Sequence, residues 1–151
     1  MKTFTLTLAL LALIAVSAPA AQAPASGSAN ETAPLSTKMK ITVGQRTFTA
    51  TLQDNETAKA FKALLPLTLQ MRDVNGNEKA FDLSSNLPTS DANPRTIRAG
   101  DLMIWSSRTV VVFYKNFPTS YSYTKLGEIG DPAGLAEALG AGNVSVTFEL
   151  K

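Results

Sequence analysis

The feature that most constrains this fold is a succession of short segments in which apolar and polar residues alternate. In the last one, residues 144–150, Val, Val, Phe and Leu occupy every second position, with Ser, Thr and Glu between them. A period of two is typical of a β-strand with one buried face. About eight such segments in one small domain favour a closed antiparallel barrel, because closure leaves no exposed edge. The predicted strands cover residues 39–43, 46–52, 67–72, 79–83, 102–105, 109–114, 123–129 and 143–150.

Two short helices are predicted between the strands. Asp54 or Asn55 is the expected N-cap of the first helix, and Pro66 ends it. Asp131 is the expected N-cap of the second, with Pro132 as the first helical residue. The predicted fold class is therefore mainly β, a closed eight-stranded antiparallel barrel with a short helix covering each end.

Two segments depart from simple alternation. Residues 110–113 read Val-Val-Val-Phe, and a continuous run of β-branched and aromatic residues indicates a strand that is buried on both faces. Residues 84–99 show no periodicity and contain two prolines, so we expect a long irregular loop. Loops of this length in compact domains are often functional.

The N-terminus has the layout of a secretory signal peptide, predicted here as residues 1–23. Lys2 precedes an uncharged apolar run at residues 6–16, and small residues follow. The run falls well short of the roughly 20 residues that a bilayer requires, so no stable membrane span is expected after cleavage. Cleavage is predicted after Ala20 or Ala23. The alternative interpretation is an N-terminal helix of the folded domain.

Residues 24–37 are rich in Ala, Pro, Ser, Gly and Asn, which predicts a flexible linker before a folded domain at residues 38–151. The chain has no cysteine, and export without disulfides suggests a bacterial periplasmic or secreted protein. The formal net charge of +2 comes without any basic run. Nucleic acid is therefore not an expected partner.

The residue inventory excludes several kinds of chemistry. With no histidine and no cysteine, the chain cannot build a Ser-His-Asp triad, a Cys-His pair or a zinc site of the usual kind. Asp73, Asn75 and Asn77 have partial calcium-loop spacing, but the glycine and the closing Glu of such a loop are misplaced. A hairpin turn is the favoured interpretation. No metal, no cofactor and no catalytic residue is predicted.

An aromatic and hydroxyl-rich segment at residues 113–124 is the strongest indication of a site. Buried tyrosine hydroxyls need polar partners, so such clusters often line pockets with polar edges. The alternative is that Phe113 and one or two tyrosines belong to the core, that Trp105 lies at a rim and that Arg72 is a surface residue. The candidate ligand-binding residues are Arg72, Trp105, Phe113, Phe117, Tyr121 and Tyr123.

Several short motifs, in order along residues 39–149, resemble those of the bacterial cyclophilin-like fold family. They are TAKAF at 57–61, LLPL at 64–67, IRAGDLM at 97–103, FY at 113–114, SYSYT at 120–124, LGEI at 126–129 and GNV at 142–144. The resemblance implies an eight-stranded barrel with a helix at each end. True cyclophilins are peptidyl-prolyl isomerases that use an arginine beside aromatic pocket residues. Arg72 lacks the Phe-Met-x-Gln run that accompanies that arginine, so no catalytic role is transferred to it.

Three hypotheses for function follow. The favoured one is an exported module that binds a small ligand or a proline-containing peptide without classical catalytic residues. The second is a divergent peptidyl-prolyl cis-trans isomerase. The third is a protein-interaction domain held by the N-terminal linker.

Overall fold

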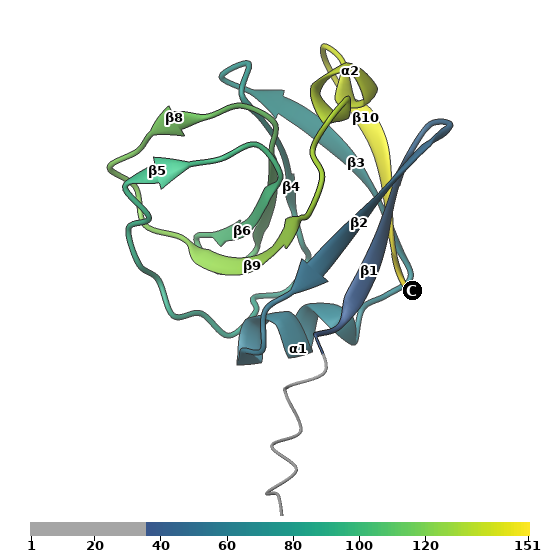
Figure 1. Cartoon of the computed structure of the whole chain (residues 1–151). Coiled ribbons are helices and arrows are strands. Elements are labelled where there is room, and N and C mark those ends of the chain that lie inside the picture. The colour runs from purple at the N-terminus through teal and green to yellow at the C-terminus, as the bar shows by residue number, and fades with distance from the viewer. Residues whose placement is uncertain (1–35) are drawn as a thin grey trace, which may run out of the picture. The chain divides into compact units, whose positions relative to one another are not determined.

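The structure is a computed structural model, and it describes residues 36–151 (Figure 1). The predicted signal peptide and residues 24–35 of the predicted linker lie outside this part. The elements, in chain order, are β1 (Lys38–Val43), β2 (Arg46–Leu52), α1 (Glu56–Lys62), β3 (Leu67–Val74), β4 (Glu78–Asp82), β5 (Thr96–Ile97), β6 (Asp101–Trp105), β7 (Thr109–Phe113), β8 (Phe117–Pro118), β9 (Thr124–Ile129), α2 (Leu135–Leu139) and β10 (Val144–Leu150).

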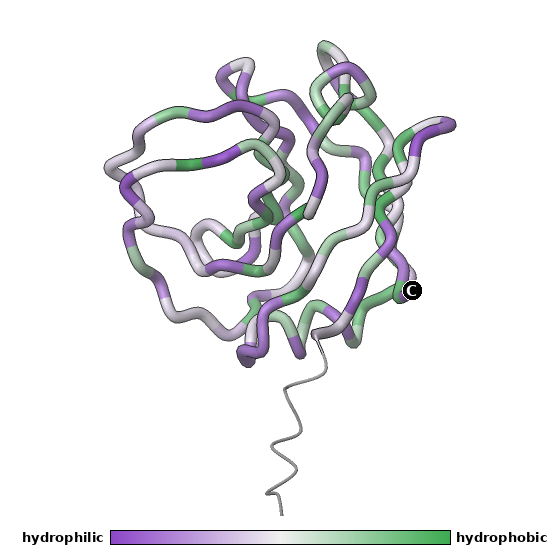
Figure 2. Tube along the Cα trace, in the orientation of Figure 1, coloured by the Kyte–Doolittle hydropathy of each residue, from purple (hydrophilic) through white to green (hydrophobic). Residues whose placement is uncertain are grey.

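Eight of these strands form a closed antiparallel barrel in the order β1-β10-β3-β4-β7-β6-β9-β2. The predicted fold class, a mainly β eight-stranded barrel with two helices, is confirmed. Buried and more exposed positions alternate along barrel strands such as β1 and β2, and Figure 2 shows the corresponding changes in hydropathy. Closure between β2 and β9 depends on Gly127, since a Cβ there would lie 2.5 Å from the Thr51 carbonyl oxygen.

The first helix begins as the sequence predicts. The Asn55 side chain is the N-cap and accepts a hydrogen bond from the Ala58 backbone N–H at 2.8 Å. The helix lies at one end of the barrel, with α2 near the opposite end (Figure 1). Phe61 is fully buried, and its ring meets that of Phe148 edge-on at 5.7 Å. This contact joins α1 to the barrel core. No helix among residues 36–151 is long and apolar enough to span a membrane.

The predicted start of the second helix is wrong. Helix α2 begins at Leu135, and its N-cap is Gly134, which has a left-handed φ of 76°. The Asp131 side chain instead accepts a hydrogen bond from the Ala133 N–H, and the Leu135 N–H donates to the Pro132 carbonyl. Asp131 and Pro132 therefore shape a turn before the helix, because the backbone at Gly134 leaves the helical region.

The prediction that residues 84–99 are irregular throughout is also wrong. Residues Thr96–Ile97 form β5, which pairs with β8 in a separate two-stranded sheet. Ile97 is fully buried beside Met103, Val111 and Phe113. Two residues give no periodic signal, and burial against the outer face of the barrel is what orders them.

The prediction that residues 110–113 are buried on both faces is confirmed. Val110 and Val112 belong to the main core inside the barrel. Val111 and Phe113 belong to a second, smaller core between the barrel wall and the β5–β8 sheet. A second packed layer thus covers the barrel wall at β7, and this layer borders the candidate site.

Candidate functional site

The base of the candidate site is the outer face of three neighbouring strands. The registers of β3, β4 and β7 align Arg72 with Ala80 and Val111, and they align Val74 with Glu78 and Phe113. Because side chains alternate across a strand, these residues share the outer face. Arg72, Val74, Glu78, Ala80 and Val111 all line one cavity on that face.

The wall of the cavity is the segment that follows Phe113. The Phe113 ring is fully buried and lies 5.7 Å from the Phe117 ring and 5.5 Å from the Tyr123 ring. Aromatic rings at these separations stabilise one another beyond the area that they bury. The Phe113 side chain therefore fixes both ends of the segment 117–123, which overhangs the outer face.

The cavity enclosed by this wall and base has a volume of about 350 Å³. That volume lies within the usual range of small-molecule sites. Trp105 and Tyr121 at its rim are 45% and 64% exposed. Exposed aromatic side chains beside an apolar floor are typical of surfaces that bind partners.

The structure brings five of the six candidate residues together, because Arg72, Trp105, Phe117, Tyr121 and Tyr123 all line this cavity. Phe113 does not line it. Phe113 lies beneath the wall as part of the second core, and its place in the candidate set was due to its position in the aromatic segment.

The charged groups of the cavity are unequally partnered. The Arg72 guanidinium forms an ion pair with Asp82 at 3.3 Å, and Asp82 also accepts a hydrogen bond from the Thr109 hydroxyl at 2.6 Å. The Glu78 carboxylate forms no hydrogen bond or ion pair with any of residues 36–151. Burial raises the pKa of Glu78, and the nearby Asp73 charge raises it further.

Asn77 adds a second unsatisfied acceptor. Within residues 36–151 its side-chain oxygen is buried and has no hydrogen-bond partner, although Asn77 lines the cavity. A buried polar atom without a partner costs about 1–3 kcal/mol, so a ligand donor that reaches this oxygen after a rotation of the side chain would offset that cost. The sequence did not indicate Asn77 or Glu78 as cavity residues, because they follow the Asn75-Gly76 turn. Asn77 was considered only for its partial calcium-loop spacing and was interpreted as part of that turn.

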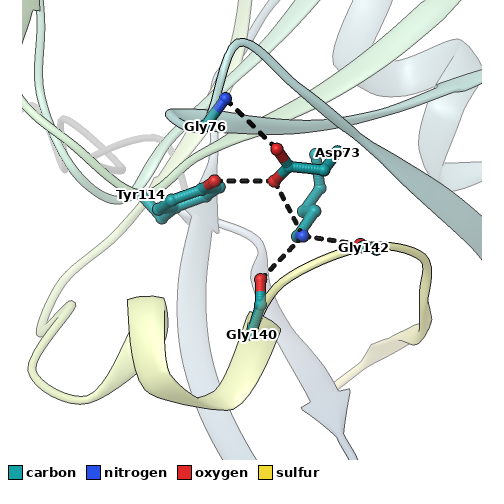
Figure 3. Close-up of polar contacts among 6 residues, drawn as sticks. Asp73, Gly76, Tyr114, Gly140 and Gly142 are labelled. Carbon is teal, nitrogen blue, oxygen red and sulfur yellow. Dashed lines mark hydrogen bonds and ion pairs between the residues drawn. The ribbon is translucent and has the colours of Figure 1, made fainter.

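The opposite face of the β3–β4 hairpin carries a polar network that reaches the C-terminal end of α2 (Figure 3). The Lys79 ammonium is fully buried and donates to Asp73 at 2.8 Å and to the carbonyls of Gly140 and Gly142 at 2.8 and 2.7 Å. The Tyr114 hydroxyl donates to Asp73 at 2.6 Å. This network attaches the C-terminal end of α2 to β3 and β4.

The network changes the acidity of its members. Hydrogen bonds from Lys79 and Tyr114 hold the pKa of Asp73 below its ordinary value. Burial, and next the Asp73 carboxylate, raise the pKa of Tyr114 to about 12. The second Asp73 oxygen accepts from the Gly76 N–H, and Asn75 and Gly76 have the positive φ values of a tight hairpin turn. Both Asp73 oxygens are thus occupied by donors of the protein.

Comparison with known proteins supports the fold. The family model described as the cyclophilin-like family matches residues 41–149, and the chain belongs to this family. No curated protein matches the chain. The solution structure of a hypothetical protein from Archaeoglobus fulgidus is similar at 17% identity, with a TM-score of 0.52 over 77% of this chain and 95% of that one. At that identity the likeness concerns the fold alone.

Proposed function

We propose that this domain binds an extended peptide in the cavity between the outer face of β3, β4 and β7 and the segment 117–123. One observation carries the proposal: the cavity combines an apolar floor with unsatisfied acceptors at Asn77 and Glu78 and a donor at Arg72. A peptide backbone offers both N–H donors and carbonyl acceptors, which matches this set. The exposed rings of Trp105 and Tyr121 supply the apolar contact.

The cellular setting of the proposal comes from the sequence. A signal peptide at residues 1–23 would export the protein, and a linker at 24–37 would leave the domain mobile in the bacterial periplasm or outside the cell. In that setting the accessible peptides are exposed segments of other exported proteins. The hypothesis of a protein-interaction domain then describes the same activity, because the peptide would be an exposed segment of a folded partner protein.

The test uses Trp105, the single tryptophan, as the reporter. Peptides of alternating alanine and proline, blocked at both ends, are titrated into the mature domain while tryptophan fluorescence is recorded. We expect a saturable change, and Tyr121→Ala should weaken binding about tenfold because an aromatic contact at a rim is a typical hot spot.

Leu150→Ala is the matched control. Leu150 is also an exposed hydrophobic residue, at 48%, but it lies on β10 outside the cavity. The proposal is wrong if no peptide changes the fluorescence, or if Tyr121→Ala and Leu150→Ala bind alike.

A divergent prolyl isomerase is the second candidate, and one specific observation favours it. Arg72 lines the same cavity as Trp105, Phe117 and Tyr123, so an arginine and aromatic residues share one site. Isomerisation needs no nucleophile, and a guanidinium near the prolyl amide is the group that the cyclophilin resemblance implies. A protease-coupled assay on a proline peptide tests it: a rate equal to that of buffer, unaltered by Arg72→Ala, would eliminate the isomerase.

A further inference from the structure

Glu78 is left without a counterion by the register of the sheet. Arg72 lies opposite Ala80, so Glu78 and Asp82 occupy the two diagonal positions beside it on β4. Diagonal neighbours on one face are close enough for long side chains to meet. Arg72 pairs with Asp82 at 3.3 Å, and Lys79, next to Glu78 in the sequence, faces the barrel interior. No cation of residues 36–151 pairs with Glu78.

Aromatic residues line the cavity together with this unpaired carboxylate. Phe113 is the direct cross-strand partner of Glu78, and the Phe113 ring contacts those of Phe117 and Tyr123. Tyr123 and Glu78 line the same cavity. Burial is the main cause that raises the pKa of Tyr123, and the Glu78 charge raises it further. Asn77 precedes Glu78 in the chain and also lines the cavity, and its buried side-chain oxygen has no partner within residues 36–151.

We propose that the part of the cavity lined by Asn77 and Glu78 is a subsite for a primary ammonium group. The Glu78 carboxylate, the Asn77 side-chain oxygen and the aromatic rings of Phe117, Tyr121 and Tyr123 all attract such a group. An ammonium has three donors and no acceptor, and an aromatic face favours a cation. The ammonium is the N-terminal amine of a bound peptide or the side chain of a lysine within it.

Any preference of the cavity for a cation must come from the groups that line it and not from the net charge of the protein. The chain carries a formal net charge of +2, so its overall field repels cations. The inference rests on the proposed peptide-binding function, and it specifies which peptides the cavity selects.

The experiment compares three forms of one alanine–proline peptide by Trp105 fluorescence at pH 7. The first form has both ends blocked, the second has a free N-terminus, and the third has blocked ends and one internal lysine. We expect at least one amine-bearing form to bind about tenfold more tightly than the blocked form, as a charge pair out of bulk water allows. The amine-bearing form that shows the higher affinity identifies the source of the ammonium, either the N-terminal amine or the lysine side chain.

Glu78→Gln should reduce this preference to about twofold or less, because the charge is lost and the shape is kept. Glu78→Lys places an ammonium of the protein in the subsite and should reverse the preference in favour of the blocked peptide. Glu56→Gln, the same chemical change at an exposed residue of α1, should leave the preference unchanged.

The outcomes separate the two proposals. If the amine-bearing forms bind no more tightly than the blocked form, or if the preference survives Glu78→Gln, the ammonium subsite is wrong while peptide binding stands. If none of the three forms binds, the proposed peptide-binding function fails, and the subsite fails with it.

Discussion

The two faces of the β3–β4 hairpin carry similar residues in opposite circumstances. On the inner face, Asp73 and Lys79 form an ion pair, and Tyr114 and two backbone carbonyls complete their hydrogen bonding. On the outer face, Arg72 takes one of two available carboxylates and leaves Glu78 unpaired. Polar groups that are fully partnered stabilise a fold, whereas polar groups left unpaired in a cavity are available to a ligand. The alternation of side chains along one hairpin thus separates a structural role from a binding role.

The largest expected effect is that of Asp73→Asn. It leaves the fully buried Lys79 ammonium without a counterion, and breaking a buried pair in this way costs about 3–5 kcal/mol of unfolding free energy. Urea unfolding monitored by Trp105 fluorescence measures it. A loss below about 1 kcal/mol would show that the interior network is not structural in the way that its geometry indicates.

Lys79→Met should cost less, about 2 kcal/mol, because methionine fills the space and the remaining Asp73 carboxylate is 27% exposed and can be hydrated. The Gly140 and Gly142 carbonyls lose their donor. We therefore expect faster amide hydrogen exchange in α2 and the following loop than in the first helix. Equal exchange in both helices would contradict the attachment of α2 by Lys79.

Tyr114→Phe removes one hydrogen bond to a charged acceptor and should cost about 1.5 kcal/mol. The raised pKa of Tyr114 means that its contribution is complete below the ordinary tyrosine pKa of 10.0 and is lost as the pH rises toward 12. Absorbance titration should show one of the three tyrosines ionising near pH 12. That transition should be absent from the variant.

Glu78→Gln should have the smallest effect on stability, a change of less than about 1 kcal/mol at pH 7 and in the stabilising direction. Since the pKa of Glu78 is raised above its ordinary 4.5, its ionisation disfavours the folded state as the pH rises through that region. A destabilisation comparable to that of Asp73→Asn would mean that Glu78 has a structural partner.

Acid unfolding distinguishes the two faces of the hairpin, because protonation of Asp73 destabilises the folded state and protonation of Glu78 stabilises it. The pKa of Asp73 lies below its ordinary 3.8, so its stabilising contribution is complete above that value and is lost as the pH falls further. Asp73→Asn should therefore reduce the loss of unfolding free energy as the pH falls. Glu78→Gln should increase that loss, since protonation of Glu78 in the unmutated protein stabilises the folded state. Thermal unfolding between pH 2 and 6 measures both slopes.

Local pattern was sufficient for most elements of the barrel. The alternation in residues 144–150 and the Asn75-Gly76 turn act through neighbours in the sequence, and each was predicted correctly. The N-cap of the first helix was predicted as Asp54 or Asn55, and the structure has Asn55. The start of α2 and the strand β5 were not. Gly134 in a left-handed conformation and Ile97 against the outer wall depend on contacts with distant segments.

The residues of the candidate site also fall into two groups, those that the sequence indicated and those that only the structure showed. The aromatic segment was visible because its composition is unusual, and five of the six residues selected from it and its surroundings line one cavity. Phe113 lies in the second core, as the alternative interpretation of the aromatic segment and the predicted burial of residues 110–113 indicated. Glu78 was not considered, and Asn77 was considered only as part of a calcium-loop spacing, because nothing in their neighbours along the chain shows that both residues line a cavity.

By itself, the sequence determined that the chain forms a mainly β barrel without His or Cys chemistry, because strand period, turn residues and residue inventory are local properties. Only the tertiary structure decided which charges meet. Asp73 and Glu78 lie five positions apart on one hairpin, yet the register gives one a buried lysine and leaves the other facing an aromatic cavity. Register is a relation between strands, and closure of the barrel is what establishes it.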